Sequence, residues 1–448
     1  MTDLSNTVPR VPKRVAAVIL NSLKGGVVPR IGLPYITVGR ETEIRALLTD
    51  LSLIADGGAS FRFLVGRYGA GKSFLLQTIR THAMGEGFVV ADADLSPERR
   101  LQGGQGQGLA TYRELIRNLS TKTRPEGGAL NLILDRWVAS TLDTRAGEDA
   151  GDEDESLMRA QLDELEEMVH GFDFARMLMR YRAATLEGDD EAKSCITRWM
   201  RGEYRTKTEA KVDLGTSTII TDDDWYDYVK LLARFLVGAG YKGLIVMIDE
   251  LVNLYKIPNA ITRQYNYEKI LTMYNDTLQG KAHHLGIIMG GTPTSIEDRR
   301  RGVFSYEALR SRLTQGRFAR EDMRDMLAPI IRLHPLTYEE LLVLIEKLGQ
   351  IHAGYFGYED TITDEDLAAF LQIEFGRVGA DTHLTPREVI RDFIELLDIA
   401  YQNPDVDIAA LLRDEGAIAG TGTPVASSNT GDSGNGDVDA APFAEFTL

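Results

Sequence analysis

Apolar and polar positions follow two different periodicities along this chain. Short apolar runs bounded by turn residues predict buried β-strands, and longer segments with apolar positions at helical spacing predict amphipathic helices. The predicted helices are Lys13–Lys24, Glu41–Ala55 and Ser73–His82, and the predicted strands are Phe61–Val65, Gly87–Leu95, Tyr241–Leu251 and Leu285–Thr292. Short apolar strands that alternate with helices favour a parallel sheet with helices on both faces. The pattern therefore predicts the α/β class in three layers.

The stretch between the second and third predicted strands is too long for a simple crossover. Residues from about 112 to 239 carry helical patterns throughout, so we interpret them as a large helical insertion. After Pro335 the pattern is helical up to about Tyr401, which predicts a small all-α domain. The predicted units are an N-terminal helical segment, an α/β domain containing the insertion, an α-helical domain and an acidic tail, at residues 1–35, 36–325, 326–405 and 406–448.

The net charge of −17 is concentrated in two segments. Asp143–Glu167 holds eleven acids and two arginines, and residues 414–448 hold six acids and no base. We interpret the acidic run Gly147–Glu155 as a solvated loop and the Gly/Ser-rich tail as disordered. Because the remainder is nearly neutral, a surface that is basic throughout is excluded, whereas a local basic face for DNA stays open.

Composition also indicates the cellular compartment in which the protein is expected. An apolar fraction of 43% is ordinary for a soluble globular protein, and no apolar run reaches the roughly 18 residues that span a bilayer. The N-terminus is polar and lacks the apolar core of a secretory signal. The single cysteine, Cys195, excludes an intrachain disulfide and a multi-cysteine zinc site. We expect a reducing, cytoplasmic location and no membrane partner.

The strongest chemical signal directly follows the first predicted strand. Residues 66–73, GRYGAGKS, fit the phosphate-binding pattern G-x-x-x-x-G-K-[ST], with an apolar strand before and an amphipathic helix after. Backbone N–H groups of such a loop surround the phosphates, Lys72 adds a positive charge, and the Ser73 hydroxyl can ligate Mg²⁺. The N-terminus of the helix favours negative charge. We therefore expect an ATP site formed by Gly66, Arg67, Tyr68, Gly69, Ala70, Gly71, Lys72, Ser73 and Phe74.

The second signal ends the third predicted strand. The run LIVMIDE, Leu244–Glu250, places two carboxylates at the C-terminal edge of a buried strand, where ligands bind in open α/β sheets. Asp249 would hold Mg²⁺ together with Ser73, and Glu250 would orient and deprotonate the attacking water. Alone, this run fits a plain strand end equally well. Downstream of a phosphate-binding loop it predicts ATP hydrolysis, with Lys72, Asp249 and Glu250 in catalytic roles.

Together these motifs resemble AAA+ ATPases of the initiator-like branch, and the run Ile330–Leu348 resembles the way lid domains of that branch begin. A closer resemblance is to the BrxC/BrxD-type ATP-binding proteins of bacterial BREX phage-defence loci. It covers about Val15 to Leu397 and is carried by four stretches, ILNSLKGGVVPRIG, ITVGRE, VGRYGAGKSFLL and MIDELVNLYKI. The resemblance implies ATP binding, a role in antiviral defence and a P-loop AAA+ three-layer parallel sheet with a C-terminal all-α lid domain.

The AAA+ resemblance assigns roles to further residues around the nucleotide. In AAA+ proteins the backbone of a Val-Gly-Arg turn lies near adenine, which implies contacts from Val38, Gly39 and Arg40. Thr292, at the end of the fourth strand, is placed like the polar sensor that contacts the γ-phosphate or the attacking water. A Gly-Thr-Pro turn explains Thr292 equally well.

The same resemblance implies two candidate arginines. Arg312, with Arg310 in reserve, is placed like the arginine finger that reaches the γ-phosphate of a neighbouring subunit. Arg387 follows Pro386 in the first turn of a predicted helix and is placed like the second arginine sensor of AAA+ lids, with Arg391 as the alternative. Solvated helix faces or structural roles remain open for all four arginines.

Two functions stay open. The first is a homo-oligomeric ATPase motor or remodeller in anti-phage defence, acting on DNA with a partner helicase; resemblance to Shango-type defence clusters adds a TerB-like protein as a partner. The second is an ATP-dependent switch or scaffold with slow turnover, in which the tail ending in Phe443, Phe446 and Leu448 docks a partner. A sequence-specific DNA-binding regulator is disfavoured. Nucleic-acid contact would come from the insertion, whose modest basic run is Arg201, Arg205, Lys207 and Lys211, unless these residues form a solvated face.

Overall fold

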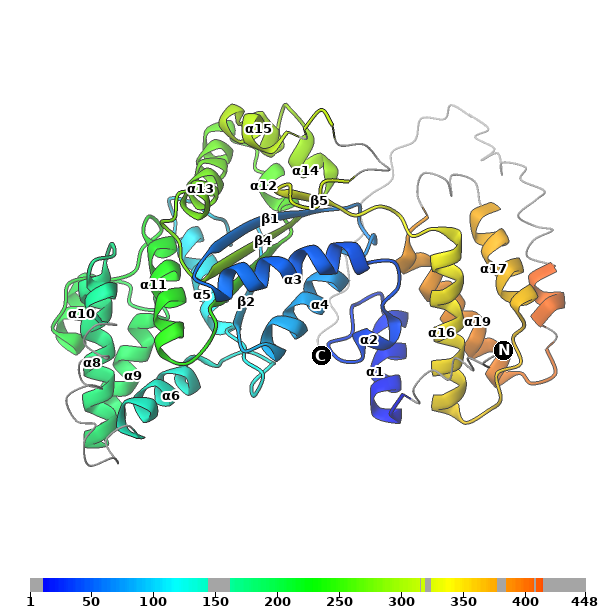
Figure 1. Cartoon of the computed structure of the whole chain (residues 1–448), viewed down its shortest axis with the longest axis horizontal. Helices are drawn as coiled ribbons and strands as arrows, with labels where there is room; N and C mark the ends of the chain where they lie inside the picture. The colour runs from blue at the N-terminus through cyan, green and yellow to red at the C-terminus, as the bar shows by residue number, and fades with distance from the viewer. Residues whose placement is uncertain are drawn as a thin grey trace, which may run out of the picture.

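A five-stranded parallel sheet forms the centre of the molecule (Figure 1). The computed structural model describes residues 11–143, 162–314, 316–318, 324–376, 384–406 and 408–413. The strands are β1 (Ala59–Val65), β2 (Val89–Asp94), β3 (Leu244–Asp249), β4 (Leu285–Gly291) and β5 (Ile330–Arg332), in the spatial order β2-β3-β4-β1-β5. The predicted α/β class is confirmed. The acidic run Gly147–Glu155 and the tail beyond Asp414 lie outside the described residues.

Alternate residues of each strand enter two separate hydrophobic clusters, which is why the strands are apolar throughout. Leu64, Val90 and Ile245 pack toward α3 (Glu41–Ala55) and α4 (Lys72–Gly85) on one face. Phe63, Val89 and Val246 pack into the larger cluster on the other face. The helices that contribute to this second cluster after β3 are α12 (Val252–Tyr255), α13 (Ala260–Leu278), α14 (Pro293–Glu297), the 3₁₀ turn η2 (Val303–Ser305) and α15 (Glu307–Leu313).

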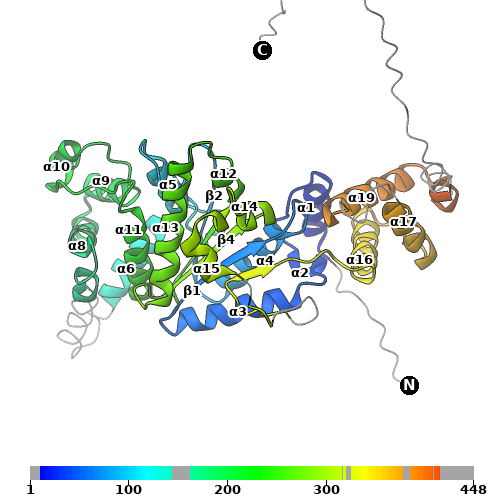
Figure 2. The same cartoon turned by 90° about the horizontal axis from the view of Figure 1, so that it is seen from above.

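The predicted insertion between β2 and β3 is helical. It contains α5 (Gln107–Arg117), α6 (Leu130–Asp143), α8 (Gly171–Glu187), α9 (Asp190–Met200), α10 (Lys207–Leu214) and α11 (Trp225–Gly238). Its buried Trp137, Trp199 and Trp225 belong to the same hydrophobic cluster as the strands. The insertion is therefore built onto one face of the sheet, and it occupies the end of the molecule opposite α16 and α19 (Figures 1 and 2).

A second core lies at the other end of the molecule (Figure 2). It unites α16 (Tyr338–Phe356), α17 (Asp364–Gly376) and α19 (Pro386–Gln402) with the N-terminal α1 (Lys13–Lys24) and α2 (Leu33–Ile36). Lys24 of α1 donates to Asp398 at 2.5 Å, and the buried His352 lies 3.1 Å from the same carboxylate. The N-terminal segment is thus helical as predicted, and it packs as a part of this C-terminal helical group.

Several predicted bounds differ from the structure, and β3 and β5 differ for local reasons. β3 begins later and ends earlier than Tyr241–Leu251, because Gly243 (φ 142°) and Glu250 (φ 62°) leave the extended conformation. β5 lies inside the range 326–405 predicted as all-α, and it hydrogen-bonds to the edge of β1. Its apolar run is too short to give a strand signal. No helix in the described part of the chain is long and apolar enough to cross a membrane.

Candidate nucleotide-binding and catalytic site

The glycine-rich loop leaves β1 at Gly66 and ends as α4 begins. Gly69 (φ 76°) and Gly71 (φ 91°) adopt the left-handed conformation that glycine tolerates best. Gly71 is the residue before α4, and no side chain caps the first N–H groups of that helix. Gly69, Gly71 and Ser73 line a pocket, so the helix N-terminus can bind an anion there.

Lys72 is held inside the loop. Its Nζ donates to the carbonyl oxygens of Gly66 and Arg67, both at 2.9 Å, and the side chain is 9% exposed. Burial lowers the pKa of Lys72, and the nearby Asp249 and Glu250 oppose that shift. The ammonium group therefore has a fixed place at the mouth of the loop, where phosphate oxygens would meet it.

The carboxylate pair lies directly beside α4. Asp249 accepts a hydrogen bond from the Ser73 hydroxyl at 3.3 Å and a second from the backbone N–H of Glu250 at 2.8 Å. The neighbouring strand makes room for it, because a Cβ on Gly290 would stand 2.1 Å from Asp249 Oδ1. Glu250 lines the pocket with its backbone in the left-handed region, a conformation that costs a non-glycine residue about 1–3 kcal/mol.

The hydroxyl oxygen of Ser73 and the carboxylate oxygens of Asp249 suit a Mg²⁺ ion that binds together with a nucleotide. The described residues contain no cluster of three or more His, Cys, Asp or Glu side chains that could hold a metal ion. Mg²⁺ commonly binds through one or two protein groups together with substrate phosphates and water. Ser73 and Asp249, 3.3 Å apart, are such a pair. The residues present therefore suit a metal ion that arrives with the nucleotide.

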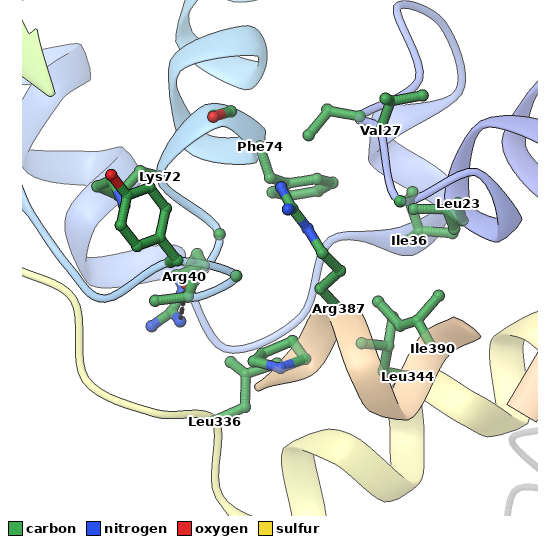
Figure 3. A pocket seen from close by; sticks show the side chains of 18 of the residues that line it. Leu23, Val27, Ile36, Arg40, Lys72, Phe74, Leu336, Leu344, Arg387 and Ile390 are labelled. Carbon is green, nitrogen blue, oxygen red and sulfur yellow. Dashed lines mark hydrogen bonds between the residues drawn. The ribbon is translucent and has the colours of Figure 1, made fainter. Parts of the chain in front are cut away.

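The rest of the pocket is apolar and comes from segments far apart in the sequence (Figure 3). The space between the lining residues measures about 970 Å³, including space open to solvent. Its apolar lining comes from α1, the segment around α2, the start of α4 and the C-terminal helical group, and includes Leu23, Val27, Val28, Ile36, Val38, Phe74, Leu336, Leu344 and Ile390. An apolar wall beside a phosphate loop suits a nucleotide base, and only Val38 and Phe74 of these residues were predicted.

The Val-Gly-Arg turn, residues 38–40, adjoins the pocket, and the side chain of Arg40 contacts the phosphate-binding loop. Arg40 is 5% exposed and donates to the carbonyl oxygens of Ala70 at 3.2 Å and His334 at 3.0 Å. Burial lowers its pKa. A Cβ on Gly39 would stand 2.5 Å from the Glu340 carboxylate of α16. The turn thus ties the phosphate loop to the start of the C-terminal helical group.

Arg387 enters the pocket from α19 (Figure 3). Pro386 and Thr385 begin that helix, as predicted, and the Thr385 hydroxyl takes part in a capping box with Glu388. The positive charge of Arg387 acts on Lys72, whose pKa it lowers. Arg391, the alternative, is exposed, pairs with Asp392 at 3.0 Å and is not among the residues lining this pocket.

Thr292, Arg310 and Arg312 do not line this pocket, and neither do Gly39, Gly66, Arg67 and Asp249, which adjoin or contact residues that do. The Thr292 hydroxyl caps α14 by accepting from the Ser295 N–H at 3.2 Å, although the preceding Gly291 accepts from the loop residue Gly66. Arg312 donates to Ala308 of its own helix at 2.7 Å, and Arg310 lies 3.6 Å from Glu307. A single chain therefore does not bring these two arginines to its own nucleotide site.

A third carboxylate beside the pair was not predicted. Asp94 ends β2 and lies opposite Asp249 in the sheet register. Loss of solvation raises the pKa of Asp94, and the negative charges of Asp249, Asp92 and Glu250 raise it further. The available signal was an acid at the end of a predicted strand, because parallel strands end at one edge of the sheet.

Comparison with known proteins agrees with this geometry. The family model described as "BREX system ATP-binding protein BrxC/D" matches residues 11–416, which include every residue of the site. A search of curated proteins found no match to the chain. The matched region begins before α1 and ends beyond α19, so it covers both the sheet and the C-terminal helical group. The chain therefore belongs to the BrxC/D family of BREX system ATP-binding proteins.

Proposed function

We propose that this chain is a Mg²⁺-dependent ATP hydrolase of the AAA+ class that works as a homo-oligomeric motor or remodeller in anti-phage defence. ATP binding and the BREX context come from the family. The observation that carries the proposal is the meeting of Lys72, Ser73, Asp249 and Glu250 at one edge of the sheet. A protein that only binds nucleotide has no need of a second carboxylate beside the metal-binding one.

Each group has a role that its position supports. The loop N–H groups and Lys72 bind the β- and γ-phosphates, and Ser73 and Asp249 hold Mg²⁺, which neutralises phosphate charge when bound. Glu250, one residue beyond Asp249, orients the attacking water and accepts its proton. Arg387 approaches from α19 and contacts phosphate, so the C-terminal helical group serves as the lid of the site.

The position of α15 supports the proposed oligomer. Arg312 and Arg310 do not line the pocket of their own chain, and we expect an arginine finger from α15 to serve a neighbouring subunit. Mixing Arg312→Ala protein with Lys72→Ala protein, each inactive alone, should then restore part of the ATPase rate. The same mixture with Arg310→Ala in place of Arg312→Ala identifies which arginine acts. A mixture that stays inactive for both arginines contradicts a finger in trans.

The experiment that tests hydrolysis uses two variants of opposite kind. Lys72→Ala should lose ATP binding, whereas Glu250→Gln should bind ATP and lose turnover by about 10²-fold or more. Mass measurement of Glu250→Gln protein with and without ATP and Mg²⁺ then shows the assembled state. Wild-type turnover by Glu250→Gln protein would remove the catalytic assignment.

A second candidate is an ATP-dependent switch or scaffold that controls assembly with slow turnover. It is favoured by two links from the phosphate loop toward the helical group: Arg40 donates to both Ala70 of the loop and His334, and Gly69 lies against Thr385. Nucleotide-dependent positioning of those helices would then be the output. Strong stimulation of the ATPase rate by DNA favours the motor, and ATP-dependent binding of a partner helicase or TerB-like protein without stimulation favours the switch.

A further inference from the structure

A short helix joins the catalytic carboxylates to a basic surface. α12 begins two residues after Glu250 and ends at Tyr255. The Tyr255 hydroxyl donates to the Asp298 carboxylate at 3.0 Å, and the guanidinium carbon of Arg301 lies 5.3 Å from the centre of the Tyr255 ring. The segment after β3 and the segment after α14 therefore meet at Tyr255.

The segment after α14 is a fixed turn. Gly302 donates its N–H to the Asp298 carbonyl at 2.8 Å, and Arg300 donates its N–H to the Asp298 carboxylate at 2.7 Å. The Tyr267 hydroxyl of α13 donates to the Arg301 carbonyl at 2.6 Å. Arg299 and Arg300 are exposed at the tip of this turn. Their backbones are thus held in place before any partner arrives.

The charge of this surface is opposite to that of the chain as a whole. Residues 251–263 and 297–302 hold five basic residues, of which Arg263 is buried, and two acids, Glu297 and Asp298, in a chain of net charge −17. Arg263 and Arg301 both donate to the Ile257 carbonyl, and the exposed Lys256 precedes that residue. The Nε of Arg301 is buried without a hydrogen-bond partner among the described residues.

The nearest carboxylate, Asp298, offsets only part of the charge of the exposed pair. Asp298 is occupied by the Arg300 N–H and the Tyr255 hydroxyl, and these hydrogen bonds lower its pKa. In the described part of the chain, no carboxylate lies within ion-pair distance of Arg299 or Arg300. Two exposed guanidinium groups on a fixed backbone suit phosphate, which accepts their planar N–H donors in pairs.

We propose that the Arg299–Arg300 turn, together with Lys256, binds the phosphodiester backbone of nucleic acid. The proposal deepens the proposed function, since it assigns the DNA contact on which a motor would act. α12 then places bound nucleic acid at the segment that directly follows Glu250, so binding can influence hydrolysis. Backbone contacts of this kind are independent of base sequence.

The basic run of the insertion is a weaker candidate. Its neighbours are acidic, because Glu209 binds Arg198 and accepts from the Arg205 N–H, and Asp213 also lies near Arg198. Lys207 and Lys211 stand on α10 with these two acids. On α10 the two lysines are matched by two acids, whereas at the turn the exposed Arg299, Arg300 and Lys256 outnumber the Asp298 carboxylate.

The test measures DNA binding by fluorescence anisotropy with labelled single-stranded and duplex oligonucleotides, on full-length protein. Arg299→Ala/Arg300→Ala should weaken binding by about tenfold or more at 0.1 M salt and reduce the salt slope by about two, because two phosphate contacts are lost. Lys207→Ala/Lys211→Ala removes the same charge from α10 and should leave both quantities unchanged. Thermal unfolding of both double variants verifies that each is folded.

Binding is measured without nucleotide and in the Glu250→Gln background with ATP, so the result does not depend on hydrolysis. A loss of DNA affinity confined to Arg299→Ala/Arg300→Ala supports the proposal even if the wild-type protein hydrolyses no ATP. If that variant has the same DNA affinity and salt slope as the protein without the two substitutions, the proposal is overturned. A loss of DNA affinity confined to Lys207→Ala/Lys211→Ala also overturns the proposal and places the contact on α10. If the wild-type protein binds no oligonucleotide at low salt, the proposal is overturned as well, and an acidic protein becomes the expected partner class.

Discussion

Gly69 of the phosphate loop lies directly against Thr385, the residue that begins α19. A Cβ on Gly69 would stand 2.6 Å from the Thr385 hydroxyl, closer than a real Cβ approaches any heavy atom. The loop and the C-terminal helical group are therefore in contact at the position where the nucleotide phosphates would bind. We therefore expect a movement of α19 to act on the loop through this contact.

Gly69→Ala should push the phosphate loop and α19 apart. The left-handed backbone strains alanine by about 1–2 kcal/mol, and the new methyl group also displaces Thr385. Gly71→Ala is the matched control, since its backbone is also left-handed but nothing lies within 4 Å of its Cβ. Hydrogen exchange should quicken in α19 for Gly69→Ala alone. Equal exchange in the two variants would contradict a mechanical link at this contact.

Arg40 should matter for stability more than for direct contact with the base. Arg40→Ala removes two buried hydrogen bonds from a charged donor and should lower the free energy of unfolding by about 1.5–3 kcal/mol. Arg40→Lys should rescue little, because one ammonium group does not reproduce the guanidinium geometry. Arg45→Ala, on the exposed side of α3, serves as control in denaturant unfolding. A loss of ATP affinity with unchanged stability would favour a base-contacting role instead.

The sequence was sufficient for those parts of the site that depend on local pattern. The bounds of α1 and α3 match the predicted ones, because amphipathic periodicity and helix ends are local properties. The loop and the carboxylate pair were also predictable, since the C-terminal ends of parallel strands meet at one edge. Their geometry agrees, with Ser73 and Asp249 joined by a hydrogen bond.

The apolar wall of the pocket was not predictable from local pattern. It depends on α1 packing against α16 and α19, which lie more than 300 residues away in the chain. Asp94 was missed for a related reason, because its importance depends on β2 being the neighbour of β3. β5 was missed because three residues carry too little periodicity to distinguish a strand from a helix start.

Arg387 is predicted to bind the nucleotide phosphates. Arg387→Ala should weaken ATP binding by about tenfold, corresponding to about 1.4 kcal/mol, because one charge-assisted contact is lost. ADP, which lacks the γ-phosphate, should be affected less if the contact is to that group. Arg391→Ala, one helical turn further along α19, should leave both affinities unchanged, as isothermal titration calorimetry can show. Equal losses in the two variants would indicate a general effect on α19.

Asp94 should make the stability of the nucleotide-free protein depend on pH. Its pKa is raised in the folded state, so the fold takes up a proton more readily than the unfolded chain does. The stabilisation by its protonated form is complete below the unfolded pKa of about 3.9 and is lost as pH rises through the folded pKa. Asp94→Asn, which cannot become charged, should therefore be more stable than the wild type at pH 7.

That gain should be below about 1 kcal/mol, because Asp94 lies at a solvent-exposed edge. It should diminish as the pH falls through the folded pKa of Asp94, where the wild-type carboxyl group becomes neutral. Glu98→Gln removes an exposed charge four residues later and should show no such gain. In the presence of ATP and Mg²⁺ the advantage of Asp94→Asn should shrink, because a cation beside Asp249 offsets the repulsion among the carboxylates. An unchanged or larger gain with ATP and Mg²⁺, measured by thermal unfolding, would place the metal ion away from these carboxylates.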